Sequence, residues 1–364
     1  MSHDSFVTIA ACAGLGRPRE LARALASLDL APDVIVETLG RHTLIRLVLI
    51  TLPEPVVRAE LAPRLADTLE QWRARSWLSI EDHVRAFQQA SSALKAHDVQ
   101  SLLLKGFYFG VRLYGGIARR PQHDVDMLVR DRDFRRACRA LRRAGFVDSS
   151  YDLHSRTYRL GEVKLDLHRC FRRAPAFRVD ERAAWDSAIE VRLGSLTVRT
   201  LSDEWTLVFL LLSAFEDIGQ GTVKLKQLTD IFLWLRAVDA ETQWDDFFSR
   251  REREALLGVS VNVLALVVTL FESAGDCPRL AAALTNRNHL IADPRRDTAL
   301  ALVFAPAKDV RNLAWFAKVY PGSLALYLAR FWYGGFPDNL SRFNWRRLRR
   351  SLQLAAGPSR PDTL

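Results

Sequence analysis

The sequence has few of the residues on which disulfide-rich or zinc-stabilised proteins depend. It contains only four cysteines in 364 residues, and no two of them form a C-x-x-C pair. Because cysteines are so few and so scattered, we expect neither a disulfide framework nor one of the common zinc motifs. No apolar stretch is long enough to span a bilayer, and the first residues lack the basic region of a signal peptide. We therefore expect a cytoplasmic protein without a membrane span.

Acidic residues are outnumbered, with 42 Asp and Glu against 52 Lys and Arg, for a net charge of +10. This excess suits a protein that attracts a polyanion, whether a nucleotide, a nucleic acid or an anionic surface. A content of 49% hydrophobic and 26% charged residues is that of a globular protein and excludes general disorder. The chain has the length of two or three domains, and no internal repeat or low-complexity linker divides it.

The stretch 101–129 predicts two strands joined by a tight turn and a short helix. It begins with an apolar run that ends at Lys105 and Gly106, where a glycine permits a turn and lets a ligand approach the backbone. A helix is predicted at 107–114, because its apolar spacing is helical and two glycines follow it. Lys105 would present a point charge to a phosphate at this turn.

The second strand, which follows a basic loop, carries two carboxylates on one face. Successive side chains of a strand point to opposite faces, so Asp124 and Asp126 lie together. Adjacent carboxylates repel each other unless a cation lies between them, and Mg²⁺ prefers carboxylate oxygens. In the later run GEVKLDLH, Asp166 and His168 share a face of another strand. If the two strands are neighbours, three carboxylates would hold one or two divalent ions that bridge a triphosphate.

Three short runs of the sequence resemble those of a known family. The runs LLLKG, RPQHDVDMLV and VKLDLH are similar to those of the uncharacterised bacterial nucleotidyltransferase family of the DNA polymerase beta superfamily. The resemblance implies an α+β fold, in which a small mixed β-sheet is surrounded by helices. It implies Mg²⁺ or Mn²⁺ as cofactor, an NTP such as ATP as substrate, and three catalytic metal ligands: Asp124, Asp126 and Asp166. The residues implied on the nucleotide side of the site are Lys105, Gly106 and Arg120. His168 is a further candidate for that side, because it shares the strand face of Asp166.

The resemblance is strongest over 100–171, and two departures from it bear on the substrate. His123 stands where relatives tend to have glycine, and Ser213 with Ala214 stands where relatives often carry histidine. Neither departure replaces a carboxylate, so both affect the substrate inference more than the metal inference.

Helical patterns flank this core on both sides and predict three regions. We expect an N-terminal helical region at 1–98, a nucleotidyltransferase core at 99–200 and a C-terminal helical domain at 201–364. Within the first region, one helix is predicted to run over 32–52. The N-terminal helices are expected to pack on the core, and the C-terminal helices to stand across the carboxylate face and form a cleft there.

Several polar residues allow two interpretations from the sequence. Lys226 and Asp230 lie one helical turn apart, which ordinarily means a surface ion pair, with a substrate contact as the alternative. His168 could orient a carboxylate, contact substrate or be a structural histidine. The arginine-rich helix predicted at 131–144 and the basic segment 343–350 could be solvated surfaces or contacts for RNA.

We predict a metal-dependent nucleotidyltransferase that moves an NMP from an NTP to an acceptor hydroxyl and releases pyrophosphate. The acceptor, whether RNA, protein, peptide or small molecule, is not given by the sequence. A glycosyltransferase is an alternative, because such enzymes also use D-x-D to hold a metal against a sugar nucleotide. A non-catalytic basic protein that binds RNA or a partner is another alternative, although all three acidic positions are filled.

Overall fold

Helices precede, interrupt and follow a region of strands, and the computed structural model describes residues 3–75, 80–151, 155–171, 179–194, 196–307 and 309–319. All of these residues belong to one compact unit. The predicted division into three regions stays a prediction. The basic segment 343–350 lies outside the described residues. No helix in the described ranges has both the length and the apolar character that crossing a membrane requires.

Several of the helices before the first strand begin at a proline, whose fixed φ suits the first turn of a helix. These helices are α1 (His3–Gly14), α2 (Pro18–Ala26), α3 (Pro32–Arg41), α4 (Ile45–Thr51), α5 (Glu54–Glu60), α6 (Pro63–Arg75) and α7 (Ile80–Lys95). The single helix predicted over 32–52 is wrong, because Thr43 adopts a φ of 56° and divides it into α3 and α4. A positive φ cannot continue a right-handed helix.

Seven strands form one mixed sheet in the order β3-β4-β5-β2-β1-β7-β6. They are β1 (Ser101–Leu104), β2 (Asp124–Val129), β3 (Val147–Tyr151), β4 (Ser155–Leu160), β5 (Val163–His168), β6 (Ile189–Leu193) and β7 (Leu196–Thr200). The pairs β1 with β7 and β2 with β5 are parallel, and the other pairs are antiparallel. This arrangement confirms the predicted α+β fold with a mixed sheet.

The pairing of β2 with β5 brings the three predicted carboxylates together. Asp126 pairs with Asp166, and Asp124 pairs with Lys164, in a parallel register. Val125 and Met127 alternate with the two aspartates of β2 and are buried, so the opposite face of the strand belongs to the core. The sequence alternation in β2 therefore separates an apolar face from a carboxylate face.

Helices between and after the strands complete the fold. They are α8 (Gly106–Tyr114), α9 (Phe134–Arg143), α10 (Glu181–Asp186), α11 (Asp203–Gln220), α12 (Leu225–Val238), α13 (Trp244–Arg253), α14 (Leu257–Leu270), α15 (Pro278–Thr285), α16 (Arg296–Phe304) and α17 (Val310–Val319). Short 3₁₀ turns, η1 (Asp131–Asp133) and η2 (Asn288–Leu290), precede α9 and α16. The helix predicted from 131 thus starts as a 3₁₀ turn.

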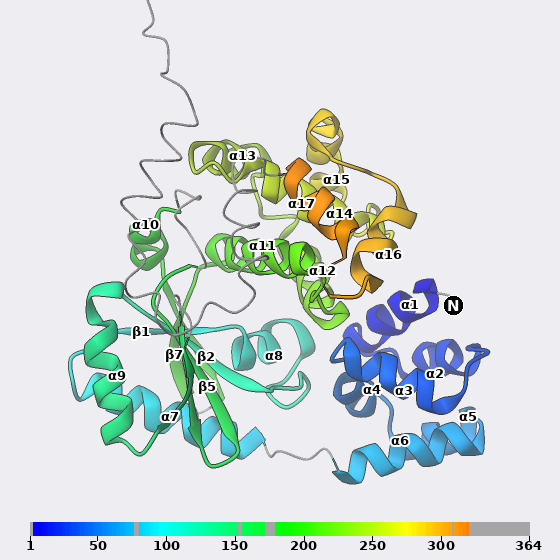
Figure 1. Ribbon diagram of the computed structural model, residues 1–364, viewed down its shortest axis with the longest axis horizontal. Helices are drawn as coiled ribbons and strands as arrows, with labels where there is room; N and C mark the ends of the chain where they lie inside the picture. The colour runs from blue at the N-terminus through cyan, green and yellow to red at the C-terminus, as the bar shows by residue number, and fades with distance from the viewer. Residues whose placement is uncertain are drawn as a thin grey trace, which may run out of the picture. The chain divides into compact units, whose positions relative to one another are not determined.

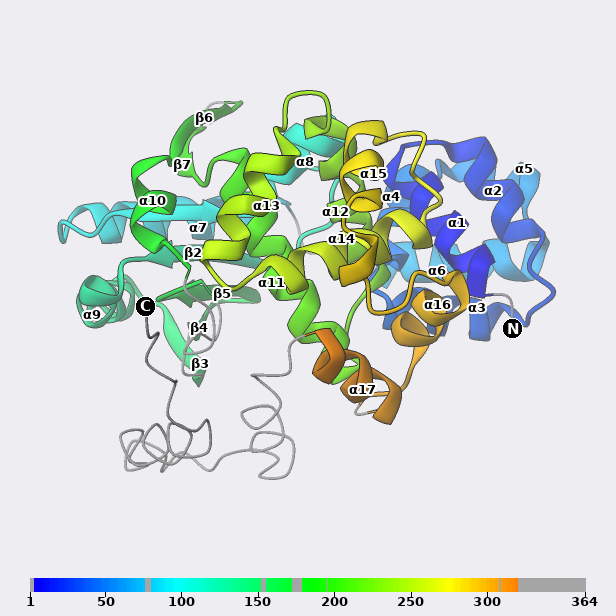
Figure 2. The ribbon, with the colours of Figure 1, turned by 90° about the horizontal axis from the view of Figure 1, so that it is seen from above.

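The helices pack in two ways. α7 lies along β2 and β5 and also contacts α9 (Figure 1). α11 and α12 lie side by side (Figure 2), and α1 packs against α12 and α16. Among the N-terminal helices, α7 thus packs on the sheet, as expected, whereas α1 packs on helices from the C-terminal part of the chain.

Candidate metal and nucleotide site

The three predicted carboxylates form one group, which we name the aspartate triad (Asp124, Asp126 and Asp166). One carboxylate oxygen from each residue lies within 4.8 Å of the corresponding oxygens of the other two. The grouping follows from strand alternation on β2 and from the direct pairing of Asp126 with Asp166 on β5. Spacings of this size suit ligands that share one or two divalent ions.

Within the triad, the surroundings of Asp124 raise its pKa. Burial among protein atoms, together with the charges of Asp126 and Asp166, raises the pKa of Asp124 from 3.8 to about 6. The nearby ammonium groups of Lys105 and Lys164 oppose this increase. The side chain of Asp124 is still 36% exposed, so it is crowded by like charge and also accessible. A hard cation brought to such a carboxylate would relieve the repulsion.

Asp166 is held by two neighbours on its own side of the sheet. The Thr157 hydroxyl on β4 donates to Oδ1 of Asp166 over 2.5 Å, and the Lys164 ammonium donates to Oδ2 over 2.9 Å. The same ammonium lies 3.9 Å from Oδ2 of Asp124. Two carboxylates of the triad therefore share one lysine.

Asp126 is held by a histidine. Nε2 of His168 lies 2.9 Å from Oδ1 of Asp126, and both side chains are largely buried. The His168 ring meets the Phe209 ring of α11 edge-on, with 6.1 Å between centroids. Of the interpretations open from the sequence, this contact favours a histidine that orients a carboxylate.

The turn after β1 has unusual backbone geometry. Lys105 adopts a φ of 48° and Gly106 also has a φ of 48°. A non-glycine residue in this region costs about 1–3 kcal/mol, and such strain gathers at functional sites. A Cβ on Gly106 would lie 3.0 Å from Oε1 of Gln122, so a side chain here would press on the Gln122 amide in addition to straining φ. The Lys105 ammonium lies 5.0 Å from the centre of the Phe209 ring, and its positive charge acts to lower the pKa of Asp124.

Arg120 belongs to a second group of charges, which we name the Asp230 cluster (Tyr114, Arg120, Lys226 and Asp230). Nε and Nη2 of Arg120 donate to the two carboxylate oxygens of Asp230 over 3.0 and 2.7 Å. The Tyr114 hydroxyl donates to Oδ1 of Asp230 over 2.7 Å. Burial alone would raise the pKa of Asp230, but Arg120 and Lys226 hold it at about 2. A buried, two-pronged ion pair thus fastens the loop before β2 to α12.

Lys226 is the surplus cation of that cluster. Its ammonium is 3.8 Å from Oδ2 of Asp230, and the side chain is 9% exposed. The interpretation of Lys226 and Asp230 as a surface pair is therefore wrong, because both are buried. Burial, Arg120 and Lys105 lower the pKa of Lys226 to about 8, whereas Asp230 and Asp124 act in the opposite direction. The charge of Asp124 thus acts on Lys226 from outside the Asp230 cluster.

His123, which stands where relatives tend to have glycine, also faces this positive region. Its burial among protein atoms, followed by the charges of Lys226, Arg46 and Arg120, lowers the pKa of His123 to about 4. The surface of the residue is nevertheless exposed, so the ring is neutral and accessible at pH 7. Arg46 of α4 donates to the backbone oxygen of Gln122 over 3.1 Å, which ties an N-terminal helix to this loop.

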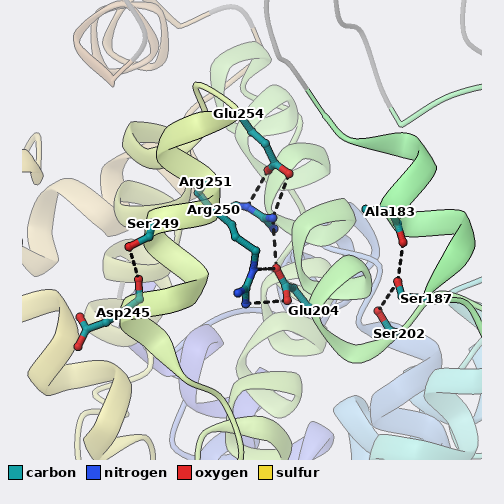
Figure 3. Close-up of polar contacts among 9 residues, drawn as sticks. All are labelled: Ala183, Ser187, Ser202, Glu204, Asp245, Ser249, Arg250, Arg251 and Glu254. Atoms are coloured by element: carbon teal, nitrogen blue, oxygen red, sulfur yellow. Dashed lines mark hydrogen bonds and ion pairs between the residues drawn. The ribbon is translucent and has the colours of Figure 1, made fainter.

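An ion-pair network secures α11, the helix that presents Phe209 to Lys105 and His168. Figure 3 shows Arg250 and Arg251 of α13 meeting Glu204 in the first turn of α11. Arg251 is fully buried and also pairs with Glu254 over 2.7 Å. Its guanidinium lies 5.0 Å from the ring centres of Trp205 and Phe247. We assign this network a structural role, because its acidic groups are balanced by its basic groups.

The arginine-rich face of α9 is exposed and partly paired. Arg136 contacts Asp133 over 2.6 Å and Arg142 contacts Asp148 over 2.9 Å. These pairs agree with a solvated helix face. The RNA-binding interpretation of the helix stays a prediction.

The donor set of the triad fits a divalent ion. Carboxylate oxygens are the preferred ligands of Mg²⁺ and Mn²⁺, and the repulsion around Asp124 shows negative charge that protein cations only partly offset. Lys164 competes for the same oxygens without matching the charge of all three aspartates.

Comparison with known proteins gives one family. The model of a family described as uncharacterised nucleotidyltransferase matches residues 30–272, which confirms the resemblance drawn from LLLKG, RPQHDVDMLV and VKLDLH. No curated protein matches significantly. The triad and the Lys105 turn lie within the matched range.

Two solved structures are similar at a low level. The antibiotic-resistance factor ANT(2'')-Ia has 16% identity and a TM-score of 0.39, covering 49% of this chain and 96% of its own. An antigenic nucleotidyltransferase-like protein from Paracoccidioides brasiliensis has 14% identity and a TM-score of 0.32, covering 56% of this chain and 93% of its own. At this level of similarity neither protein's activity transfers to this chain.

Proposed function

This chain belongs to the uncharacterised nucleotidyltransferase family, and we propose that it moves a nucleoside monophosphate from an NTP to an acceptor hydroxyl with release of pyrophosphate. The observation that carries the proposal is the triad, whose oxygens lie within 4.8 Å of one another on two paired strands. The acceptor is an RNA, a protein, a peptide or a small molecule that presents a hydroxyl group.

We assign Asp124, Asp126 and Asp166 as ligands of Mg²⁺ or Mn²⁺. Such an ion, when bound, neutralises phosphate charge and lowers the pKa of a hydroxyl that is about to attack. The raised pKa of Asp124 supports this assignment, since like-charged neighbours and burial are its causes. His168 holds Asp126 in one orientation through the contact at 2.9 Å, so we assign it a positioning role.

Lys105 and Lys226 are the side chains that we assign to the triphosphate. The ammonium of Lys105 lies over the Phe209 ring and acts on Asp124, and that of Lys226 lies 3.8 Å from Oδ2 of Asp230. A polyanion near both amines would supply the negative charge that the buried Lys226 lacks. The backbone at Lys105 and Gly106 turns with positive φ, and turns of this kind can present N–H groups to a phosphate.

In this proposal Arg120 is a positioning residue that does not contact the nucleotide. Two of its three guanidinium nitrogens donate to Asp230, which favours fastening α12 to the loop over the direct nucleotide contact predicted from the sequence. The amide of Gln122 is buried, and within the described residues neither of its polar atoms has a hydrogen-bond partner. We assign this amide to substrate recognition, because a buried unpaired amide costs about 1–3 kcal/mol until a ligand satisfies it.

The test is incubation with each of the four labelled NTPs, Mg²⁺ or Mn²⁺ and a cell extract, followed by identification of the labelled species. We expect one nucleotide to label an acceptor, with loss of the label in EDTA and in Asp126→Asn. Absence of metal-dependent labelling with all four nucleotides would contradict the proposal. Sugar transfer from a sugar nucleotide would instead support the glycosyltransferase alternative.

A further inference from the structure

Lys164 has a position that the proposed chemistry does not use. It lies on β5 directly opposite Asp124 on β2, two residues before Asp166 and on the same strand face. Its ammonium is 2.9 Å from Oδ2 of Asp166 and 3.9 Å from Oδ2 of Asp124. The protein thus places its own cation between two of the three carboxylates.

The backbone keeps this lysine close to the triad. β5 is an inner strand that pairs with β2 on one side and with β4 on the other, so the Cα of Lys164 is fixed beside that of Asp124. The Lys164 ammonium donates a hydrogen bond to Oδ2 of Asp166 over 2.9 Å, so the positive charge of this side chain lies against that carboxylate.

Charge balance limits what else the triad can hold. Three carboxylates bring three negative charges, and Lys164 offsets one of them. A single divalent ion then balances the charge that the three carboxylates and Lys164 leave, whereas a second ion without nucleotide would leave at least two positive charges unmatched, and the ammonium of Lys105 adds to that excess. Like charges at such short range repel strongly even at an effective dielectric constant of about 20.

We propose that Lys164 takes the place of a second divalent ion on Asp166, so that the nucleotide-free triad binds one ion, through Asp124 and Asp126. The inference rests on the metal site of the proposed function, and it concerns metal stoichiometry and affinity rather than transfer. His168 and Lys164 then have different roles. The histidine orients Asp126 for the ion, and the lysine neutralises Asp166.

The experiment is a Mn²⁺ titration of the metal-free, full-length protein without nucleotide, read from the electron paramagnetic resonance signal of free Mn²⁺. We expect wild type to bind one Mn²⁺ per chain. Lys164→Met should bind two, with the first at least about tenfold tighter, because a competing unit charge near 4 Å is gone. Lys164→Arg keeps the charge and should titrate like wild type, as should Lys95→Met, which removes an exposed lysine elsewhere.

Several results would overturn the proposal. One is a titration of Lys164→Met that matches wild type, which would mean that the side chain swings away from the ion. Another is binding of two ions by wild type with Lys164 in place. Circular dichroism checks that each variant is folded, and Lys164→Gln, which keeps a donor for Asp166 without the charge, replaces Lys164→Met if that variant unfolds. Normal Mn²⁺ binding without nucleotidyl transfer would count against the proposed function alone. Absence of Mn²⁺ binding in wild type would overturn the metal site and this inference together.

Discussion

Two aspartates in this molecule, Asp124 and Asp230, have pKa values that move in opposite directions. The pKa of Asp124 rises to about 6, because burial and two neighbouring carboxylates disfavour its charge. The pKa of Asp230 falls to about 2 although burial opposes this, because Arg120 and Lys226 surround it. The side chain of Asp124 is 36% exposed and that of Asp230 is 4% exposed.

This difference in pKa distinguishes a group of charges that joins two parts of the fold from a group that can bind a ligand. The Asp230 cluster matches a carboxylate with a guanidinium and a hydroxyl in a water-poor setting, so its contacts are satisfied within the protein. The aspartate triad gathers like charges at an accessible position, which costs stability unless a cation arrives. A group with an excess of charge of one sign is thus the part of the site that can bind a ligand, whereas a group whose charges are balanced is not. Lys226 is the positive counterpart, since its ammonium exceeds what Asp230 alone requires.

The largest expected effect is on transfer when the triad loses a charge. Asp126→Asn removes a metal-ligand charge and should lower nucleotidyl transfer by about a thousandfold or more, while the protein stays folded. Label incorporation and circular dichroism measure the two properties. Asp29→Asn, at an exposed position in the first helical region, is the matched control. Transfer within tenfold of wild type in Asp126→Asn would remove Asp126 from the site.

Substitutions in the Asp230 cluster should instead change the stability of the fold. Asp230→Ala leaves Arg120 buried without its partner and should lower the free energy of unfolding by about 3–5 kcal/mol. The double variant Arg120→Met with Asp230→Leu should lose less than the sum of the single changes. Urea unfolding measures each variant, and Glu37→Ala, which breaks an exposed pair with Arg41, should change stability by less than about 1 kcal/mol. A loss that small in Asp230→Ala would contradict a structural role.

The pH dependence of stability should reveal Lys226. Its pKa is about 8 in the folded protein against 10.5 ordinarily, so between these values the unfolded chain holds a proton that the folded chain has lost. Stability therefore rises with pH over this window by up to about 3 kcal/mol, and the full cost of the buried charge is present below pH 8. Urea unfolding at pH 7 to 10 should show this rise in wild type relative to Lys226→Met. Parallel curves for the two proteins would contradict a buried, charged Lys226.

His168 should have a smaller effect, on transfer and metal affinity together. His168→Leu removes the hydrogen bond to Asp126 and should reduce both by about 10–100-fold. His168→Gln keeps a donor near the carboxylate and should retain more of each. Equal losses in the two variants would mean that the ring itself contacts substrate.

The sequence predicts the strands of the site well but not the buried charges beside it. The alternation in HDVDMLV and VKLDLH predicted which side chains share a face, because strand periodicity is a local property. That β2 and β5 are neighbours came from the family resemblance, since the two segments are far apart in the chain. The structure adds the register that pairs Asp126 with Asp166.

The burial of Lys226 and Asp230 escaped prediction for a physical reason. A lysine and an aspartate four residues apart look the same on a surface helix and on a buried one, and the partner that decides, Arg120, is 110 residues from Asp230. One signal was present. In LKQLTDIFLWLRAV most of the other positions are apolar, and a helix that is apolar all round is buried. The divided helix at Thr43 was also missed, because its positive φ has no pattern in side-chain hydrophobicity.

The smallest expected effect makes the comparison sharpest, because two changes of the same kind should have opposite signs. Asp124→Asn removes a charge that its neighbours repel, so in EDTA the free energy of unfolding should rise by up to about 1 kcal/mol, reduced by the exposure of the side chain. Asp230→Asn removes a charge that its neighbours attract, and the free energy should fall. Thermal melting of both variants measures the signs. In Mn²⁺ the first difference should reverse, because wild type gains binding free energy that Asp124→Asn has largely lost. A fall in stability for both variants in EDTA would mean that Lys105 and Lys164 already neutralise the triad, and the contrast between the two groups would fail.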